Sequence, residues 1–186
     1  MSEPHPSPPF AVTLYCRAEK ARTEEVFARV VAFSAAGSWT SARREFKRLS
    51  RRLQRHIRLA EDAFFPLFEV KTGGATGLTR ELVDDHRAIA RDLGQLEVCL
   101  RDRRLDDLAE CVRTLRDRMA EHDGRELRLL CPLIDRLLSD AERQFLGSRV
   151  LTAGKPGARR PPGRSAVLGP QATRLPSRRE VSRGEK

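Results

Sequence analysis

Two stretches of the chain repeat one pattern, in which a histidine is followed ten residues later by Pro-Leu. The first is HIRLAEDAFFPL (residues 56–67) and the second is HDGRELRLLCPL (residues 122–133). The two histidines lie 66 residues apart, and so do the two prolines. An internal repeat indicates that one supersecondary unit is used twice. We therefore predict a duplicated helical hairpin within one small domain.

Four segments of the chain have apolar residues at every third or fourth position, the spacing of one face of an α-helix. We expect helices at about residues 17–36, 38–70, 78–101 and 105–138. Gly37 should end the first, the stretch KTGGATG (residues 71–77) should form the second connection, and a charged turn at residues 102–104 the third. Short connections make consecutive helices antiparallel. The predicted fold class is all-α, an up-down-up-down four-helix bundle with disordered termini.

Pro66 and Pro132 lie inside the second and fourth helices and should weaken or bend them locally, as should Gly124. With α-helical spacing throughout, the inward face of the second helix comprises Phe46, Leu49, Leu53, His56, Ala60, Phe64 and Leu67. The inward face of the fourth comprises Leu108, Val112, Leu115, Met119, His122, Glu126, Leu130, Leu133 and Leu137. On the same spacing Glu61 is turned about 100° away from Ala60.

The charge and composition of the chain divide it into three parts. We expect residues 1–14, rich in proline and serine, to be disordered, residues 15–150 to form the bundle, and residues 151–186 to be a disordered tail rich in Pro, Gly and Arg. The net charge is +10, and residues 152–186 contribute nine basic and two acidic side chains to it. Such a tail could bind nucleic acid or an acidic partner, although no aromatic residue is present there for base stacking.

Several function classes are excluded by what the sequence lacks. No apolar run approaches the roughly 20 residues of a membrane span, so we expect no membrane partner, and the N-terminal residues do not resemble a signal peptide. We therefore expect a cytoplasmic protein, with the excess of Arg over Lys typical of a GC-rich bacterial genome. Neither a Gly-rich phosphate loop nor a nucleophile elbow occurs, so we do not expect an enzyme. The four cysteines are Cys16, Cys99, Cys111 and Cys131; without a C-x-x-C pair, they are most simply reduced core thiols.

Apart from His5, the chain has three histidines, and all three lie on apolar faces of different predicted helices: His56, His86 and His122. Glu126 lies one turn after His122 on the same face. Buried imidazoles and a buried carboxylate are costly unless they are hydrogen-bonded or bound to a metal. This ligand set favours iron, manganese or zinc. The alternative is that carboxylates such as Glu126 and Asp85 hydrogen-bond the histidines without any metal.

Three segments resemble the hemerythrin-like (HHE cation-binding) domain family. HIRLAEDAFFPLFE and HDGRELRLLCPLID are similar to its two H-x-x-x-E…F-P segments, and LVDDHRAIARDL is similar to its third-helix segment. The resemblance covers about residues 17–138. It implies a four-helix bundle that encloses a non-haem iron site, often with two irons bridged by carboxylates. It also implies a role in binding dioxygen, in sensing oxygen, redox state or iron, or in handling nitric oxide.

The chain departs from the family pattern at three places. The first-helix segment AEKARTEEVF lacks the iron-binding histidine of the family, and Glu19, Lys20 or Thr23 lies near its place. Ala60 replaces the bridging glutamate of the first repeat, so the neighbouring Glu61 would need a local rotation of the helix to reach the site. Cys131 replaces the aromatic residue before the second proline.

The metal ligands expected from the resemblance are His56, Glu61, His86, His122 and Glu126. With this reduced set, the cofactor is one or two non-haem iron ions, or none if the site is a relic. We expect a protein that binds or senses a small oxidant such as dioxygen or nitric oxide, or that handles iron. The alternative is a metal-free bundle that acts as a regulatory or interaction module through its basic tail. The oligomeric state is not predicted.

Overall fold

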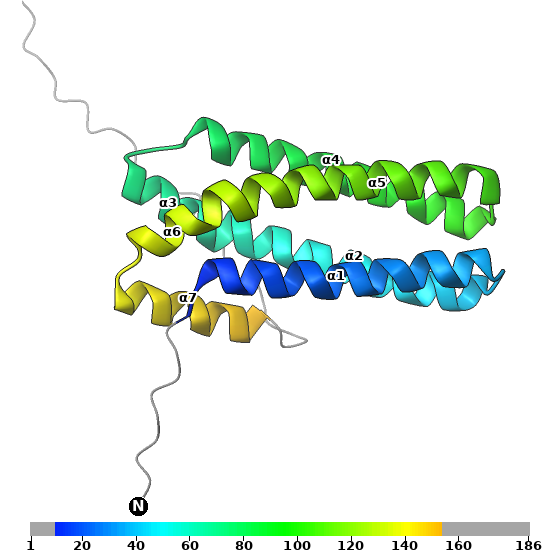
Figure 1. Ribbon diagram of the computed structural model, residues 1–186, viewed down its shortest axis with the longest axis horizontal. Helices are drawn as coiled ribbons and strands as arrows, with labels where there is room; N and C mark the ends of the chain where they lie inside the picture. The colour runs from blue at the N-terminus through cyan, green and yellow to red at the C-terminus, as the bar shows by residue number, and fades with distance from the viewer. Residues whose placement is uncertain (1–9, 154–186) are drawn as a thin grey trace, which may run out of the picture. The chain divides into compact units, whose positions relative to one another are not determined.

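The computed structural model describes residues 10–153 of the 186-residue chain, and helices occupy nearly all of this part. Two of the bundle helices are uninterrupted, and each of the other two contains a π-helical turn, denoted η. In chain order the elements are α1 (Val12–Ala35), α2 (Trp39–Leu59), η1 (Ala60–Phe64), α3 (Phe65–Thr72), α4 (Gly77–Asp102), α5 (Leu105–Arg125), η2 (Glu126–Leu130), α6 (Cys131–Leu137) and α7 (Asp140–Ala153). α1 packs along α2, and α4 packs along α5 (Figure 1). The predicted all-α, up-down-up-down bundle is confirmed, with α7 as an additional helix.

The predicted connections between the helices are present, and each has an identifiable local cause. Gly37 has a φ of +68°, and the Ser38 N–H donates to the Phe33 carbonyl at 2.8 Å, so α1 ends in a left-handed glycine turn. α3 likewise ends at Gly73, whose φ is +83°. Thr76 then caps α4, because its hydroxyl accepts from the Thr79 N–H at 3.2 Å. These short turns keep neighbouring helices antiparallel.

The first helix starts at Val12, earlier than residue 17 and inside the segment expected to be disordered. No local side chain caps it. Instead, the Asp135 carboxylate on α6 accepts from the backbone N–H groups of Val12 and Thr13, at 2.7 and 3.0 Å. A carboxylate at a helix N-terminus satisfies exposed donors and complements the helix dipole. The expectation for residues 12–14 was therefore wrong because a distant residue caps this helix.

Replacing Asp135 with alanine should destabilise the protein by about 1–2 kcal/mol, because two backbone donors at the start of α1 lose a charged acceptor. Urea denaturation measures this change in unfolding free energy. Asp84→Ala is the matched control, since Asp84 forms only an exposed ion pair with Arg87 and should change stability by less than about 0.5 kcal/mol. Equal effects of the two substitutions would contradict the capping role.

The helix α7 was not predicted from the sequence. Its core contact is Leu146, which is fully buried in the same cluster as Val12 and Phe64. Ser139 and Glu142 cap its start: the Glu142 carboxylate accepts from the Ser139 N–H at 2.8 Å. The Ser-x-x-Glu spacing is a known helix-start signal that could have revealed α7. Because α7 continues to Ala153, residues 151–153 are helical rather than part of a disordered tail; the other expectations for residues 1–9 and 154–186 lie outside the described residues.

The π-helical turns change which residues face inward in the second half of each interrupted helix. Both turns have the same place in the repeat, since η1 and η2 begin 66 residues apart. Beyond η2 the buried residues are Cys131, Ile134 and Leu138, whereas Leu133 and Leu137 are 40% and 39% exposed. The prediction that Leu133 and Leu137 face inward was therefore wrong. Beyond η1, similarly, Phe65 and Phe68 are buried and Leu67 is only partly so.

The cause of both turns is the proline that follows each of them. Pro66 and Pro132 have no N–H, and their rings exclude the carbonyl four residues earlier from a normal helical bond. In the structure the Phe65 N–H donates to the Ala60 carbonyl and the Cys131 N–H to the Glu126 carbonyl, each five residues back. A single wide turn thus accommodates each proline, and it rotates the helix that follows.

The core of the bundle consists of two apolar clusters with polar side chains between them. One cluster includes Phe27, Leu53 and Ile89, and the other includes Phe64, Leu82 and Leu130. His56, His86 and His122 lie between the two clusters in the sequence. His56 follows Leu53 of the first cluster, and His86 lies between Leu82 and Ile89. The bundle therefore has a buried polar layer.

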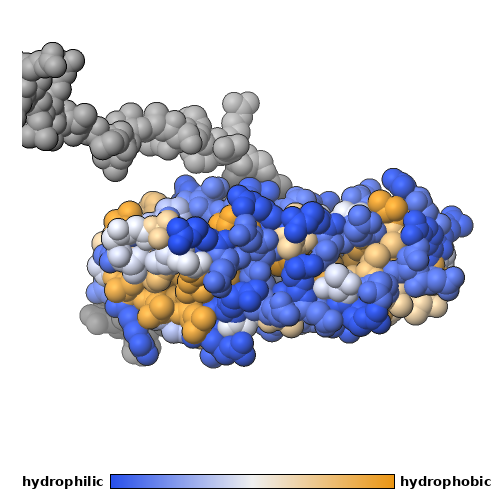
Figure 2. Space-filling view, turned by 90° about the horizontal axis from the view of Figure 1, so that it is seen from above, coloured by the Kyte–Doolittle hydropathy of each residue, from blue (hydrophilic) through white to orange (hydrophobic). Residues whose placement is uncertain are grey.

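The surface of the described part is mostly hydrophilic in Figure 2, and hydrophobic residues gather at the end where α3 and α6 lie in Figure 1. Three exposed leucines recur at four-residue spacing along η2 and α6: Leu129, Leu133 and Leu137. Among the described helices, none combines the length and the apolar character that crossing a membrane requires.

Candidate metal centre

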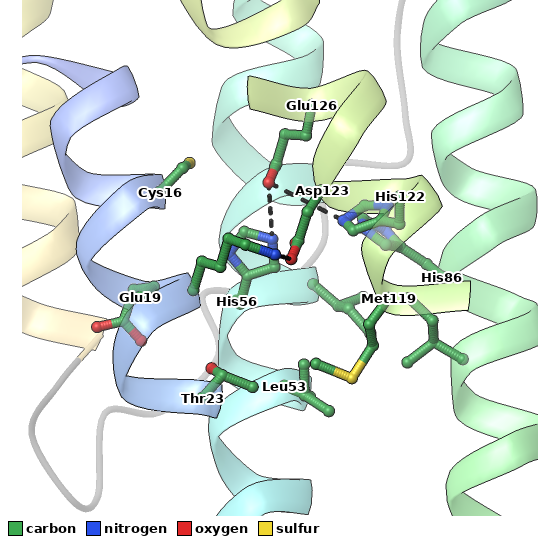
Figure 3. A pocket seen from close by; sticks show the side chains of 13 residues that line it. Cys16, Glu19, Thr23, Leu53, His56, His86, Met119, His122, Asp123 and Glu126 are labelled. Atoms are coloured by element: carbon green, nitrogen blue, oxygen red, sulfur yellow. Dashed lines mark hydrogen bonds and ion pairs between the residues drawn. The ribbon is translucent and has the colours of Figure 1, made fainter. Parts of the chain in front are cut away.

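Three helical segments each place one histidine in the polar layer: α2 provides His56, α4 provides His86 and α5 provides His122 (Figure 3). The ring centroids of His86 and His122 are 4.8 Å apart, and the His56 ring lies 6.3 and 6.1 Å from them. One nitrogen of each ring lies within 4.8 Å of one nitrogen of both others. The histidines that the sequence placed on three separate faces therefore meet at one interior point.

Glu126 lies beside this point, as the first residue of η2. Its Oε2 is 3.3 Å from His56 Nε2 and 3.9 Å from His122 Nε2 (Figure 3). Burial raises the pKa of Glu126, but the neighbouring His56, His122 and His86 together outweigh it, and the pKa is lowered overall. Conversely, burial lowers the pKa of His56, but the carboxylates of Glu126, Asp123 and Glu19 together outweigh it, and this pKa is raised. Glu126 and His56 thus each favour the charged form of the other.

The other two imidazoles are held in the neutral form. Burial, together with the neighbouring His86 and His56, lowers the pKa of His122 to about 4, although the Glu126 carboxylate acts in the opposite direction. Burial likewise lowers the pKa of His86. At neutral pH both rings therefore have a free lone pair, which is the state that binds a metal.

Glu61 reaches the centre through His86. Its Oε1 lies 2.8 Å from His86 Nδ1, and because an ionised carboxylate can only accept, Nδ1 is the protonated nitrogen. This leaves Nε2 of His86 without a proton and without a partner. The ring is also stacked on Phe65, with centroids 5.6 Å apart and planes 10° apart. Glu61 thus fixes the orientation and tautomer of His86, as carboxylates behind metal-binding histidines do.

Ala60 and Glu61 are the first two residues of η1, the wide turn before Pro66. Ala60 is fully buried and faces inward as its spacing predicts, whereas the side chain of Glu61 is 38% exposed. The Glu61 carboxylate therefore reaches the outer nitrogen of His86 from the edge of the centre. Each of the five predicted metal ligands therefore lies at the centre or, in the case of Glu61, directly behind it.

Hydrogen bonds within the described chain do not satisfy the polar atoms at this centre. Six buried side-chain atoms of residues 10–153 lack a hydrogen-bond partner, and five belong to the three histidines and Glu126: His56 Nδ1, His86 Nε2, His122 Nδ1, His122 Nε2 and Glu126 Oε1. Each such atom costs about 1–3 kcal/mol. A cavity of about 20 Å³, room for one water-sized sphere, lies among these side chains.

Asp85, the carboxylate considered as a metal-free partner of the histidines, mainly binds Arg125. Its two oxygens accept from this guanidinium at 2.7 and 3.0 Å. His122 Nδ1 lies 3.7 Å from Asp85, too far for a hydrogen bond. Carboxylates of the described chain therefore leave His122 unsatisfied.

Three residues of α1 lie near the place where the family has its first-helix histidine: Glu19, Lys20 and Thr23. All three line the cavity, but Glu19 and Lys20 form ion pairs with other residues. The Glu19 carboxylate lies 3.2 Å from Arg55 and 3.1 Å from Arg22. Lys20 pairs with Asp123 on α5. Thr23 is buried, and it offers only a hydroxyl.

Sequence reasoning missed two thiols at this centre, Cys16 of α1 and Cys131 of α6. Both are buried and free. Their sulfur atoms and one carboxylate oxygen of Glu126 all lie within 4.8 Å of one another. Hydrogen bonding to Cys131 and burial raise the pKa of Cys16 well above its ordinary value. Cys131 replaces the aromatic residue that the family has before its second proline, and that departure was the only signal of this cluster.

The metal-free protein should lose stability as the pH falls from about 6.5 to 4. In this range His122 is protonated in the unfolded chain but stays neutral in the folded protein. Protonation therefore favours unfolding and should lower the unfolding free energy by roughly 1–3 kcal/mol. His56 acts in the opposite direction. Because its pKa is raised in the folded protein, its contribution to stability is present at low pH and is lost as the pH rises through the folded pKa. Urea denaturation at several pH values measures the net slope. His122→Asn, which cannot be protonated, should flatten it; equal slopes would contradict the assignment.

The donor set fits a non-haem iron ion. Imidazole and carboxylate suit iron and zinc, and the lone pairs of His86 and His122 are available at neutral pH. An ion bound among the three rings would satisfy unpartnered nitrogens that the protein alone leaves unsatisfied. The three histidines, Glu126 and the orienting Glu61 are the residues that would hold it.

Comparisons with known proteins identify the family. The family model of the hemerythrin HHE cation-binding domain matches residues 15–134. No match was found among curated proteins or among solved structures. The matched region covers well over half of the 186 residues and contains all three histidines of the centre. The chain therefore belongs to the hemerythrin HHE cation-binding domain family.

Proposed function

We propose that this protein is a hemerythrin-like, non-haem iron-binding protein that binds or senses dioxygen, nitric oxide or redox state, or handles iron. The observation that supports it is the set of five unpartnered buried atoms on the three histidines and Glu126. A purely structural histidine would have its ring nitrogens hydrogen-bonded. The same observation disfavours the alternative, a metal-free regulatory module, because unpaired buried atoms cost stability and nothing in such a module would offset that cost.

Each residue of the centre has a definite part in the proposed function. His86 and His122 provide neutral imidazoles, while at His56, whose pKa is raised, an ion competes with a proton for the ring. Glu126 provides negative charge, and Glu61 holds the His86 ring in place. A bound iron would supply an open coordination position for a diatomic ligand.

The size of the cavity limits what the centre can accept. About 20 Å³ is too little for an organic substrate, and ligand pockets for small molecules usually measure some hundreds of Å³. Leu53, Ile89 and Met119 form apolar parts of its wall. These features support binding or sensing of a small oxidant rather than turnover of a larger molecule.

The test is to load the purified protein with ferrous iron without oxygen, remove unbound metal and count iron per chain by mass spectrometry. We expect one or two ions per chain and a change in the visible spectrum on adding nitric oxide. His5→Ala, which removes the histidine outside the described residues, is the matched control and should change neither result. Iron well below one per chain would reject the proposal. Salt-sensitive nucleic-acid binding that disappears on truncation after Ala153, the last residue of α7, would then support the alternative.

A further inference from the structure

A second group of potential ligands lies against the histidine centre and shares one residue with it. This thiol cluster consists of Cys16 on α1, Cys131 at the start of α6, and Glu126 at the start of η2. One ligand atom of each lies within 4.8 Å of the other two. All three side chains are buried, with exposed fractions of 3%, 0% and 2%. Cys16 also lines the cavity that the three histidines surround (Figure 3).

The carboxylate of Glu126 is placed to serve both groups. Its Oε2 faces the nitrogens of His56 and His122, at 3.3 and 3.9 Å. Its Oε1 is buried and has no hydrogen-bond partner within the described chain. A buried carboxylate oxygen without a donor is costly, and a cation bound beside it would remove this cost.

From this arrangement we infer that Cys16, Cys131 and Glu126 bind a second, thiophilic divalent ion of the zinc or iron class, beside the ion at the histidines. The inference rests on the proposed function, because Glu126 is common to both sites. Thiolate sulfur selects zinc and iron over magnesium and calcium. Three protein ligands leave one position of a tetrahedral ion for water or a small molecule.

Binding at the thiol cluster balances in charge and in protons. Each thiol loses its proton to solvent as its sulfur bonds to the ion, so two protons are released per divalent ion bound. The two thiolates then neutralise the ion, and Glu126 remains available to offset charge at the histidines. α1 thereby contributes a sulfur ligand to the centre, although its Glu19 and Lys20 are paired elsewhere.

The remaining two cysteines provide a matched control. Cys99 and Cys111 also bring their sulfur atoms together, 3.1 Å apart. No third His, Cys or carboxylate group of residues 10–153 completes a cluster with them. A thiol pair alone therefore occurs twice in this chain, and only one of the pairs lies against a carboxylate and the histidine centre.

The test uses cobalt(II) as the probe, added without oxygen to the reduced full-length chain. Cobalt bound to thiolate gives an intense near-ultraviolet charge-transfer band, and cobalt bound to nitrogen and oxygen alone does not. For the wild-type protein we expect two equivalents of cobalt and this band. Cys16→Ser/Cys131→Ser should bind one equivalent and lose the band, and Cys99→Ser/Cys111→Ser should keep both.

The outcomes separate this inference from the proposed function. One equivalent without a thiolate band in the wild-type protein would overturn the thiol site and leave the histidine site standing. No bound cobalt would overturn both. A band that persists in Cys16→Ser/Cys131→Ser would also overturn the inference, because other thiols would then be the ligands. The wild-type spectrum requires no variant, so the test stands even if the double substitution impairs folding.

Discussion

Replacing His122 and Glu126 together with alanine should reduce bound iron from at least one ion per chain to less than about a tenth of that. The substitution removes one of the three converging imidazoles and the carboxylate that lies closest to His56. Losing even one outer partner of a metal ligand typically costs 10–100-fold in affinity, so losing two donors should cost at least 100-fold. Iron at 100 times its Kd stabilises the wild-type fold by about 2.7 kcal/mol, and the variant should lose this stabilisation.

The metal-free variant should behave differently, which distinguishes a metal site from a structural pair. Without iron, the double substitution removes three unpartnered buried atoms, but it also leaves a cavity and takes away the carboxylate that lies 3.3 Å from His56 Nε2. We therefore expect the variant to be less stable than the wild-type protein by about 3–5 kcal/mol in the presence of chelator, and by about 2.7 kcal/mol more in the presence of iron. Urea denaturation with iron and with chelator measures both values. A large destabilisation that is the same with and without iron would show that His122 and Glu126 only support the fold.

Replacing Ala60 with glutamate should make the stability of the protein depend on metal. Ala60 is fully buried at the start of η1, in the place that Glu126 occupies at the start of η2. A carboxylate there should be destabilising by on the order of 3 kcal/mol in the metal-free protein, because it adds buried charge to a packed position. With iron bound, the same carboxylate gains a cationic partner, and most of the loss should be recovered.

Ala60→Gln is the matched control for this experiment, since glutamine has nearly the same size without the charge. It should destabilise the protein by overpacking, with or without iron, by about 1–3 kcal/mol. Calorimetric melting of both variants with iron and with chelator measures the difference. If iron stabilises the two variants equally, the position of Ala60 does not face the metal centre as the repeat implies.

The sequence was sufficient to predict which parts of the chain form helices and how they are connected. The periodicity of apolar residues depends on local geometry, and the turns at Gly37 and Gly73 require a positive φ that glycine adopts at little cost. The convergence of the three histidines could also be predicted, because they lie on apolar faces and the inward faces of an antiparallel bundle meet. The helix α7 was not predicted, because its single fully buried leucine gives no periodic signal. Ser139, which caps this helix, was not recognised as a helix-start residue.

Contacts between residues far apart in the chain could not be predicted in this way. The cap on α1 comes from Asp135, and the thiol cluster combines Cys16 with Cys131. Nothing in the local sequence around Val12 or Cys16 indicates these partners. They exist because α1 packs against α6 in the folded bundle.

By itself the sequence determined that the chain forms a four-helix bundle with three inward histidines, because helical spacing and turn residues act locally. Only the tertiary structure decided the orientation of each helix beyond its proline. Pro66 and Pro132 remove a backbone donor, yet a helix can respond with a kink, a break or a wide turn. In the folded chain both prolines are accommodated by a wide turn, with a hydrogen bond to the carbonyl five residues back. This turn rotates the helix that follows, so that Leu133 and Leu137 face solvent while Ile134 and Leu138 are buried.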